Sequence, residues 1–365
     1  MRITYVINSV EGGGAQSPLP HIVGALEKAG AKVTVLALAR RNGKAIALLE
    51  RHGIRFEVRE GEEGDHLAAL RWIVAQAREH SSDVLWTSLT RATLLGQIAG
   101  QRLLLPVVSW QHNAFLKPWN ERLLRLRSSA SDLWIADSDD VAQLTARRMR
   151  VAQTRLMTWP IFAADPAAPV ARPALRGERL RIGSLGRLHP NKGYDVLIEA
   201  LRLMVRQDPV IAGRVSFAIA GIGEEEDSLR QKATALGVAD LIQFVRHIDD
   251  PAAFLAACHA YVQPSRREGF CIAAHEAMQA GLALVVSRTG QMPRTVTAAD
   301  AGLVVEPKEP EELAAALIEL ARDDTRRAVW GANARRHVLS QYSKDRFDAI
   351  GAEIVSRIAS LPIRR

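Results

Sequence analysis

Two hydrophobic patterns alternate along the first 160 residues. Short apolar runs typical of strands occupy residues 3–7, 32–38, 54–58, 84–87, 107–110 and 133–136. Between several of these runs, at residues 19–29, at 67–77 and from 94 onward, apolar residues recur at the helical period. Strands that alternate with helices of this length indicate parallel βαβ units. The first half therefore predicts an α/β domain.

The composition changes between residues 163 and 179. This stretch is rich in proline and alanine and lacks periodicity, so it predicts a linker at 166–179. The strand-and-helix pattern then restarts, and three helices, at about 310–322, 326–342 and 344–359, close the chain. We expect an N-terminal domain at 1–165, a second domain at 180–342, and a terminal helix at 343–365 that packs back on the first domain.

The expected fold class is α/β, with two Rossmann-like, doubly wound parallel sheets that face each other. A chain of 365 residues exceeds the 250–300 residues at which single hydrophobic cores stop growing, which favours two domains. Such sheets bind ligands at the carboxyl ends of their strands. The cleft between the domains is therefore the expected site.

The composition indicates the cellular compartment in which the protein is expected. The sequence is 48% hydrophobic and has no uninterrupted apolar stretch of about 18 residues. The N-terminus reads directly into a strand without a signal-peptide cleavage region. Two cysteines, Cys258 and Cys271, are too few for a disulfide framework, which suits a reducing cytosol. We expect a cytoplasmic protein.

The net charge of +8 favours an acidic partner: nucleic acid, anionic lipid or a phosphorylated small molecule. No basic run interleaved with aromatics supports nucleic acid, so we expect none as a partner. Arginines cluster at 122, 125 and 127 and again at 147, 148 and 150. Such clusters are more often a solvated helix face. If they are functional, the leucines among them suit an anionic membrane surface, with the protein peripheral at its inner face.

The segment from Pro264 to Met278 carries the most informative chemistry. Glu268 lies on a loop after an apolar strand, and Glu276 lies about one turn inside the following helix. Helical side chains lean toward the N-terminus, so Glu276 can point back toward the helix start. Free amides there suit a phosphate, and the two acids suit sugar or ribose hydroxyls. Acidic residues near helix starts also occur simply because they suit the helix dipole.

Two further glycine-rich turns follow strands in this half. In the first, which runs from Gly186 to Gly193, Arg187 and Lys192 could grip a diphosphate and balance the charge on a leaving group. By itself a basic loop is usually only a loop. The second turn, Gly221-Ile222-Gly223, is a weak signal because it lacks the full dinucleotide fingerprint.

In their order and spacing these residues resemble the retaining family-4 glycosyltransferases, which have the GT-B architecture. The resemblance covers nearly the whole chain, and its most specific part is the Glu-x7-Glu signature formed by Glu268 and Glu276. Gly186-Arg187 with Lys192-Gly193 matches the family's diphosphate turn.

The resemblance implies a role for each matching residue. Arg187 and Lys192 bind the donor phosphates, Glu276 binds the ribose, and Glu268 binds the transferred sugar. In the N-terminal half, His112 at a strand end contacts that sugar near the reacting centre, although a lone histidine is more often structural. The implied catalytic residues are Glu268, His112, Arg187 and Lys192. The implied donor-binding residues are Gly13, Gly14, Arg187, Lys192, Gly221, Arg246, Gly269, Phe270, Cys271, Ile272 and Glu276, with the backbone of 245–247, His247 included, bordering the base.

Some positions depart from the family pattern. Cys271 stands where glycine is usual, and His275 stands where an apolar or small residue is usual. The remaining departures are Thr289-Gly290-Gln291, Arg294, the absence of an Asn-Gly pair at 157–162, and the prolines Pro18 and Pro20 near the first helix. For the turn Ala136-Asp137-Ser138, a helix cap at Ser138 is at least as good an interpretation as a ligand contact.

The resemblance implies transfer of a sugar from a nucleoside diphosphate to an acceptor hydroxyl with retention of anomeric configuration. No cofactor and no metal are expected, because two cations can replace a divalent ion. The expected partners are a nucleotide-sugar donor and a saccharide or lipid-linked acceptor, as in polysaccharide, lipopolysaccharide or glycolipid assembly. A GT-B nucleotide-sugar epimerase and a non-catalytic nucleotide-sugar-binding protein are the alternatives. A nicotinamide dehydrogenase is disfavoured because neither half has the complete fingerprint.

Overall fold

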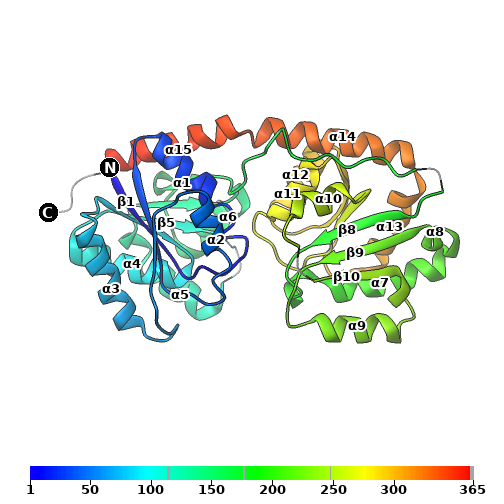
Figure 1. Ribbon diagram of the computed structural model, residues 1–365, viewed down its shortest axis with the longest axis horizontal. Helices are drawn as coiled ribbons and strands as arrows, with labels where there is room; N and C mark the ends of the chain where they lie inside the picture. Colours follow the sequence, from blue (N-terminus) through cyan, green and yellow to red (C-terminus); the bar gives the residue numbers. More distant parts are fainter. Residues whose placement is uncertain (113–115, 176, 247, 362–365) are drawn as a thin grey trace. The chain divides into compact units, whose positions relative to one another are not determined.

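The computed structural model describes residues 1–112, 116–175, 177–246 and 248–361, and it divides into two compact units. Unit 1 comprises Met1–Ala163 and Lys344–Arg365, and unit 2 comprises Ala164–Ser343. Both units are α/β (Figure 1).

Unit 1 is built on a parallel sheet of seven strands in the order β3-β2-β1-β4-β5-β6-β7. Its strands are β1 (Arg2–Ile7), β2 (Lys32–Ala37), β3 (Phe56–Val58), β4 (Val84–Ser88), β5 (Val107–Gln111), β6 (Leu133–Ala136) and β7 (Leu156–Thr158). Its α-helices are α1 (Leu19–Lys28), α2 (Ile46–Arg51), α3 (His66–Glu79), α4 (Thr90–Leu103), α5 (Pro118–Leu126), α6 (Asp139–Met149) and α15 (Lys344–Ala359). The strand order reverses between β1 and β4, as in doubly wound folds.

The last helix, α15, belongs to unit 1 because it packs on α1. The indole of Trp159 donates a hydrogen bond to the Phe347 carbonyl (3.1 Å), and Lys28 pairs with Asp348 (3.0 Å). Gly351 permits the close approach, since a Cβ there would lie 3.1 Å from both Ala25 and Trp159.

Unit 2 has a six-stranded parallel sheet in the order β10-β9-β8-β11-β12-β13, which repeats the unit 1 order without its last strand. Its strands are β8 (Leu180–Leu185), β9 (Val215–Ala220), β10 (Ile242–Val245), β11 (Ala260–Gln263), β12 (Ala283–Ser287) and β13 (Gly302–Val305). Its α-helices are α7 (Tyr194–Gln207), α8 (Pro209–Gly213), α9 (Glu226–Ala235), α10 (Pro251–Ala256), α11 (Ile272–Gln279), α12 (Met292–Ala299), α13 (Pro310–Arg322) and α14 (Asp324–Gln341).

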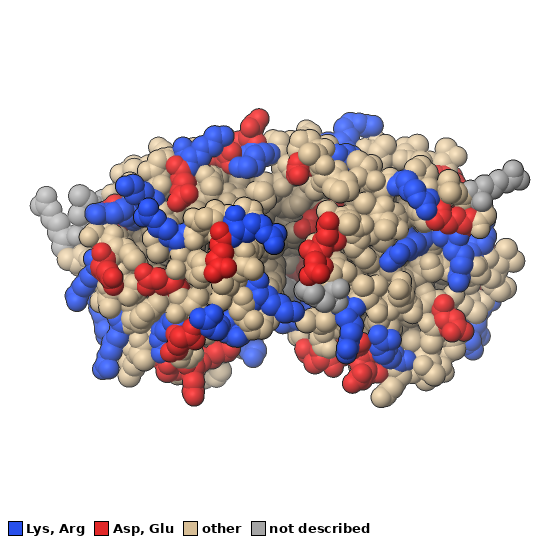
Figure 2. Space-filling view, in the orientation of Figure 1, with Lys and Arg blue, Asp and Glu red and all other residues tan. Residues whose placement is uncertain are grey.

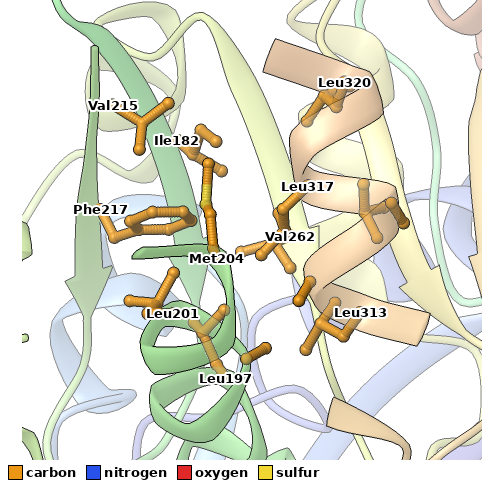
Figure 3. Close-up of a cluster of buried hydrophobic side chains, with 14 of the residues drawn as sticks. Ile182, Leu197, Leu201, Met204, Val215, Phe217, Val262, Leu313, Leu317 and Leu320 are labelled. Carbon is orange, nitrogen blue, oxygen red and sulfur yellow. The ribbon is translucent and has the colours of Figure 1, made fainter. Parts of the chain in front are cut away.

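Helices α7 and α13 bury their apolar faces on one side of the unit 2 sheet. Figure 3 shows Leu197 and Leu201 of α7 and Leu317 of α13 directed toward Phe217 and Val262 of the strands. All five side chains are at most 1% exposed. Burial of a large apolar side chain contributes about 1.5–3 kcal/mol, so this layer stabilises the packing of the helices on the unit 2 sheet.

Several expected elements differ from the observed ones. The segment 166–179, expected as a linker, is part of unit 2, where Ala171 donates to the Ala280 carbonyl (2.8 Å). The short helices α2, α8 and α10 and the strand β7 did not emerge from the hydrophobic pattern. Pro18 and Pro20 lie at the start of α1, where a missing amide hydrogen costs nothing.

No helix in the described part of the chain combines the length and the apolar character needed to cross a membrane. On the face shown in Figure 2, basic and acidic side chains are interspersed over both units.

Candidate functional site

Two loops meet at the point in unit 2 where the strand order reverses. One follows β8 and contains the 3-10 turn Pro190–Lys192, and the other follows β11 and leads to α11. Arg266 fastens them together: its amide donates to the Asn191 carbonyl (2.8 Å), and its guanidinium pairs bidentately with Asp195 (2.7 and 2.5 Å). Planar two-point pairs of this kind fix geometry as well as charge.

Glycines allow these loops to approach each other. Gly193 has a φ of +67°, and a Cβ there would lie 2.1 Å from the Pro264 carbonyl oxygen. Gly221 has a φ of +146°, and a Cβ there would lie 2.1 Å from the Gly186 carbonyl oxygen. Packing between loops therefore suffices to explain Gly221, for which the sequence analysis expected donor contact.

Lys192 and Glu268 form the centre of the site. The Lys192 Nζ atom donates to Glu268 Oε1 at 2.6 Å, although the two residues are 76 positions apart. Ser265 Oγ donates to the same oxygen at 2.7 Å. Both bonds fall on Oε1, and Oε2 takes part in neither.

A buried chain of hydrogen bonds leads from β11 to the Glu268 carboxylate. The Tyr261 hydroxyl donates to Gln263 Oε1 (2.6 Å), and Gln263 Nε2 donates to Ser265 Oγ (2.8 Å), so the chain runs from the end of β11 to Glu268. These side chains are fully buried. Fully connected buried networks fix side-chain positions, and so the Glu268 carboxylate is held before any ligand arrives.

The charge of Lys192 persists although its side chain is partly buried. Desolvation acts to lower the pKa of the partly buried Lys192 ammonium, but the charge and hydrogen bond of the Glu268 carboxylate, together with Cys271 and Tyr194, raise the pKa above its usual value. Lys192 therefore stays protonated throughout the physiological range and offers a fixed positive charge.

Helix α11 begins immediately after this loop. Its N-cap residue, Cys271, has a left-handed backbone (φ 63°) and makes no side-chain cap, so the amides of Ile272 and Ala273 precede the first intrahelical bond. The Phe270 side chain is buried and stacks on His275 at 3.9 Å between ring centroids. Phe270 therefore faces the core, and only its backbone can serve a ligand.

His275, unexpected at this position, supports the helix start. Its Nδ1 lies 2.9 Å from the Cys271 carbonyl, and its Nε2 lies 3.3 Å from Thr295 Oγ1. Burial lowers the pKa of the His275 imidazole to about 4, so the ring is neutral at physiological pH. Burial raises the pKa of the Cys271 thiol, so this group is also neutral at physiological pH.

Glu276 lies on the second turn of α11 and is half-buried. Desolvation raises the pKa of its carboxyl to about 7. Within the described chain, the carboxylate has no hydrogen-bond or ion-pair partner. A desolvated acid without a partner is costly in the free protein, which marks it as a candidate for binding hydroxyl donors.

The remaining expected cations differ from Lys192. Arg187 lies on the turn after β8, is exposed, and has no ion-pair partner among the described residues. Arg246 follows β10 and is exposed, and its Nε atom lies 3.2 Å from Glu226, which also pairs with Arg230. His247 lies outside the described residues. Gly269 accepts a hydrogen bond from the Gln291 amide (2.9 Å), which ties its backbone to the next loop.

In unit 1, the turn after β1 is open to solvent at Gly13 and Gly14. The Gly13 carbonyl accepts hydrogen bonds from the amides of Gln16 (3.1 Å) and Ser17 (3.0 Å), which lead into α1. A Cβ at Gly13 would meet only the tip of the Gln16 side chain, at 3.4 Å. Internal packing therefore does not require glycine there.

His112 lies at the carboxyl end of β5, as expected. Its imidazole contacts Ser88 (2.6 Å) and the carboxylate of Asp137 (3.0 Å). Asp137 also accepts a hydrogen bond from the Trp110 indole (2.5 Å). Ser138 caps α6 by accepting a hydrogen bond from the Val141 amide (3.2 Å), so its side chain serves the helix start.

The structure thus brings Lys192 and Glu268 into contact and places Arg187 and the α11 start on the adjoining loop segments. It places His112 in unit 1. Sequence reasoning missed Ser265, Arg266 and Asp137 as supporting residues. The partners of Arg266 and Asp137 are distant in sequence, whereas Ser265 bonds to Glu268 within its own segment. Among the described residues, no three His, Cys, Asp or Glu side chains gather in a way that could hold a metal ion.

Both halves match known families. A family model described as "Glycosyl transferases group 1" matches residues 170–337, and one described as "Glycosyltransferase Family 4" matches residues 12–162. The chain is 30% identical over 357 residues to the phosphatidyl-myo-inositol mannosyltransferase of Mycolicibacterium smegmatis, covering 89% of this chain and 86% of that protein.

A second relative is matched over a shorter part of its length. The chain is 28% identical over 291 residues to the D-inositol 3-phosphate glycosyltransferase of Geodermatophilus obscurus, covering 72% of this chain and 64% of that protein. The chain thus spans less than two thirds of that curated relative.

Solved structures agree on the fold. The Anabaena protein Alr3699/HepE, crystallised in complex with UDP-glucose, superposes with a TM-score of 0.85 at 24% identity, covering 98% of this chain and all of that one. Together with the two parallel-sheet units, this likeness shows the GT-B fold. The chain therefore belongs to family 4 of the glycosyltransferases.

Proposed function

We propose that this protein is a retaining glycosyltransferase that moves a sugar from a nucleoside diphosphate to an acceptor hydroxyl. The observation that carries the proposal is the Lys192–Glu268 pair, held beside the amides that begin α11 at the strand-order reversal of unit 2. A fixed cation next to free amides suits a diphosphate, and a preformed carboxylate beside them suits sugar hydroxyls.

Each group has a task in this reaction. Lys192, Arg187 and the amides of Ile272 and Ala273 stabilise the charge that develops on the departing diphosphate. Glu276, half-buried and without a described partner, accepts hydrogen bonds from the ribose. Glu268 orients the transferred sugar through its hydroxyls.

In the proposed mechanism the acceptor attacks the sugar from the side that the diphosphate leaves. The bond between the anomeric carbon and the phosphate oxygen breaks as the bond to the acceptor oxygen forms on the same face. The acceptor proton passes to the leaving phosphate oxygen, which balances the step without a protein base. Catalysis then consists of positioning and of stabilising negative charge, and the cations take the place of a metal ion.

The relatives support this class of donor and acceptor. The HepE structure holds UDP-glucose, and the mycobacterial relative is named for mannosyl transfer to a phosphatidyl-inositol. We propose accordingly a nucleotide-sugar donor, a saccharide or lipid-linked acceptor, and a role in the assembly of cell-surface polysaccharide or glycolipid.

A membrane surface completes the proposal. On α5 the exposed side chains Trp119, Leu123 and Leu126 fall at i, i+4 and i+7, on one face of the helix. Arg122, whose guanidinium lies 5.7 Å from the Trp119 ring centroid, and Arg125 flank this stripe. An apolar stripe bordered by arginines suits the interface of an anionic bilayer, and we propose a peripheral position at the cytoplasmic membrane face.

A donor screen tests the enzymatic proposal. The protein is incubated with UDP-, GDP- and other nucleotide sugars, first for a thermal shift and then for transfer or hydrolysis in the presence of a chelator. We expect one donor class to raise the melting temperature and to be turned over without metal. Binding without turnover with any acceptor would favour a nucleotide-sugar-binding protein, and epimerisation without an acceptor would favour an epimerase.

The stereochemistry of the product tests retention directly. The anomeric configuration of the product, read by NMR, is expected to match that of the donor sugar. An inverted product would overturn the retaining mechanism and leave the transferase proposal intact.

Vesicle co-sedimentation tests the membrane surface. We expect the protein to sediment with phosphatidylglycerol vesicles more than with phosphatidylcholine vesicles, and Trp119→Ala with Leu126→Ala to abolish the difference. Leu67→Ala is the matched control, because Leu67 is equally exposed (71%) but lies on α3. Equal sedimentation with both lipids would contradict the proposal.

A further inference from the structure

A polar cluster in unit 1 lies where three neighbouring strands end. Ser88 is the last residue of β4, His112 follows β5, and Asp137 follows β6. The parallel register pairs Ser88 with Trp110 and Gln111 with Ala136, so the three strand ends lie side by side. Adjacent strands therefore deliver the three side chains to one spot.

The Asp137 carboxylate determines which imidazole nitrogen carries a proton. His112 Nδ1 lies 3.0 Å from Asp137 Oδ1 and 3.1 Å from Oδ2. An ionised carboxylate can only accept hydrogen bonds, so Nδ1 must be the donor. The Trp110 indole also donates to Asp137 Oδ1, at 2.5 Å, which fixes the carboxylate from a second side.

The ring itself has little freedom to turn. The His112 imidazole stacks on the Trp110 indole, with centroids 5.4 Å apart and planes 22° apart. The side chains of His112 and Asp137 are 9% and 4% exposed. The other ring nitrogen, Nε2, lies 2.6 Å from Ser88 Oγ.

Ser88 completes a Ser–His–Asp arrangement, but its burial argues against a nucleophile. Its exposed fraction is 0%, so no substrate carbon reaches its oxygen in this structure. A serine hydroxyl can both donate and accept and can rotate. Donating to Nε2, it occupies the lone pair at which a substrate hydroxyl would bind.

We propose that Asp137 is a positioning residue that holds His112 in one tautomer, with the proton on Nδ1 and Nε2 as the acceptor, and that Ser88 occupies Nε2 in the free protein. A sugar hydroxyl that reaches this imidazole donates its hydrogen to Nε2, and Ser88 gives up that position by rotating. The inference rests on the proposed function for the nature of the substrate, but the tautomer is a property of the free protein.

Nitrogen NMR of the free protein tests the tautomer without any substrate. Two-bond proton–nitrogen spectra of the full chain labelled at histidine are recorded near neutral pH, and a His112→Gln spectrum assigns the signal. We expect a protonated Nδ1 and an unprotonated Nε2. A proton on Nε2, in the neutral or the doubly protonated ring, overturns the proposal. Asp137→Asn is expected to shift the equilibrium toward the Nε2–H tautomer, whereas Ser88→Ala is expected to leave the proton on Nδ1.

Kinetics with the nucleotide sugar that the donor screen selects give the second test. We expect Asp137→Asn to lower kcat on the order of 100-fold while the donor KM changes less than about threefold. Asp132→Asn, at the opposite end of β6, is the matched control, and we expect its kcat to stay within about twofold. An unchanged kcat in Asp137→Asn overturns the positioning role. Absence of transfer by the wild-type protein refutes the proposed function instead, and the NMR result then stands alone.

Discussion

The two units share one strand order but carry different chemistry at their strand ends. In unit 2, the loops after β8 and β11, on the two sides of the order reversal, bring a lysine and a glutamate into contact. In unit 1, the last residue of β4 and the residues after β5 and β6, on one side of the reversal, form a network around a histidine. The difference teaches that a doubly wound sheet fixes where a site lies, whereas the loops decide its charge.

The glycine turns differ in the same way. In unit 2, Gly193 and Gly221 are required because backbone oxygens of other loops lie where a Cβ would be. In unit 1, Gly13 is free of such crowding and lies open to solvent. Packing between loops therefore preforms the unit 2 site. In the unit 1 turn, the space beside the Gly13 backbone is open, so a ligand could come close to it.

The largest expected effect comes from removing the positive charge of Lys192 in unit 2. Lys192→Ala should lower kcat/KM for the donor about 10³-fold, because it deletes charge stabilisation and leaves Glu268 buried without its cation. Lys232→Ala, which breaks the ion pair between Lys232 of α9 and Glu199 of α7, is the control and should stay within about twofold. The measurement is steady-state transfer with the identified donor, and a loss below tenfold in Lys192→Ala would contradict the role of unit 2 charge.

Loop crowding in unit 2 gives the next largest effect. Gly193→Ala should destabilise the protein by about 3 kcal/mol, since its Cβ would overlap the Pro264 carbonyl. Gly237→Ala is the matched control, with a similar φ of +68° and no atom within 4 Å, and should cost about 1 kcal/mol. Urea unfolding followed by circular dichroism measures both, and equal losses would show that the contact with Pro264 is unimportant.

The smallest expected effect is on the pH dependence of stability, which arises from the raised pKa of Glu276. Because its folded-state pKa is raised from 4.5 to about 7, the folded protein binds this proton more tightly than the unfolded chain. Stability is therefore lost as the pH rises from about 4.5 through 7, by up to roughly 3 kcal/mol.

Glu276→Gln should remove that loss. We expect the variant to be about 2 kcal/mol more stable than wild type at pH 8, equal to it near pH 4, and weaker in donor binding. Thermal unfolding across this pH range and donor titration measure the two effects. A stability difference that does not change with pH would refute the burial of this carboxyl.

The pattern of apolar residues predicted most of the strands and the long helices. Motif spacing singled out Lys192, Glu268 and Glu276 as candidates, and His112 was a candidate because it lies at the end of an expected strand. Supporting residues escaped prediction. Arg266 acts through Asp195, 71 residues away, and Asp137 acts through a strand neighbour 25 residues away. Ser265 lies only three residues from Glu268, but the sequence pattern did not reveal that its hydroxyl supports that carboxylate. The terminal helix α15 was expected to pack on the first domain, but its contacts with Trp159 and Lys28 could not be derived.

The sequence by itself determined the alternation of strands and helices, the two-part organisation, and the loops that carry charged residues, because these follow from local periodicity and composition. Only the tertiary structure decided that Lys192 forms an ion pair while Arg187 stays exposed. It also decided that close packing between loops requires glycine at position 221, and that Ser88 and Asp137 hold His112. The physical reason is the separation of these residues along the sequence. The contacts join atoms that only folding brings together, so no local sequence pattern predicts them.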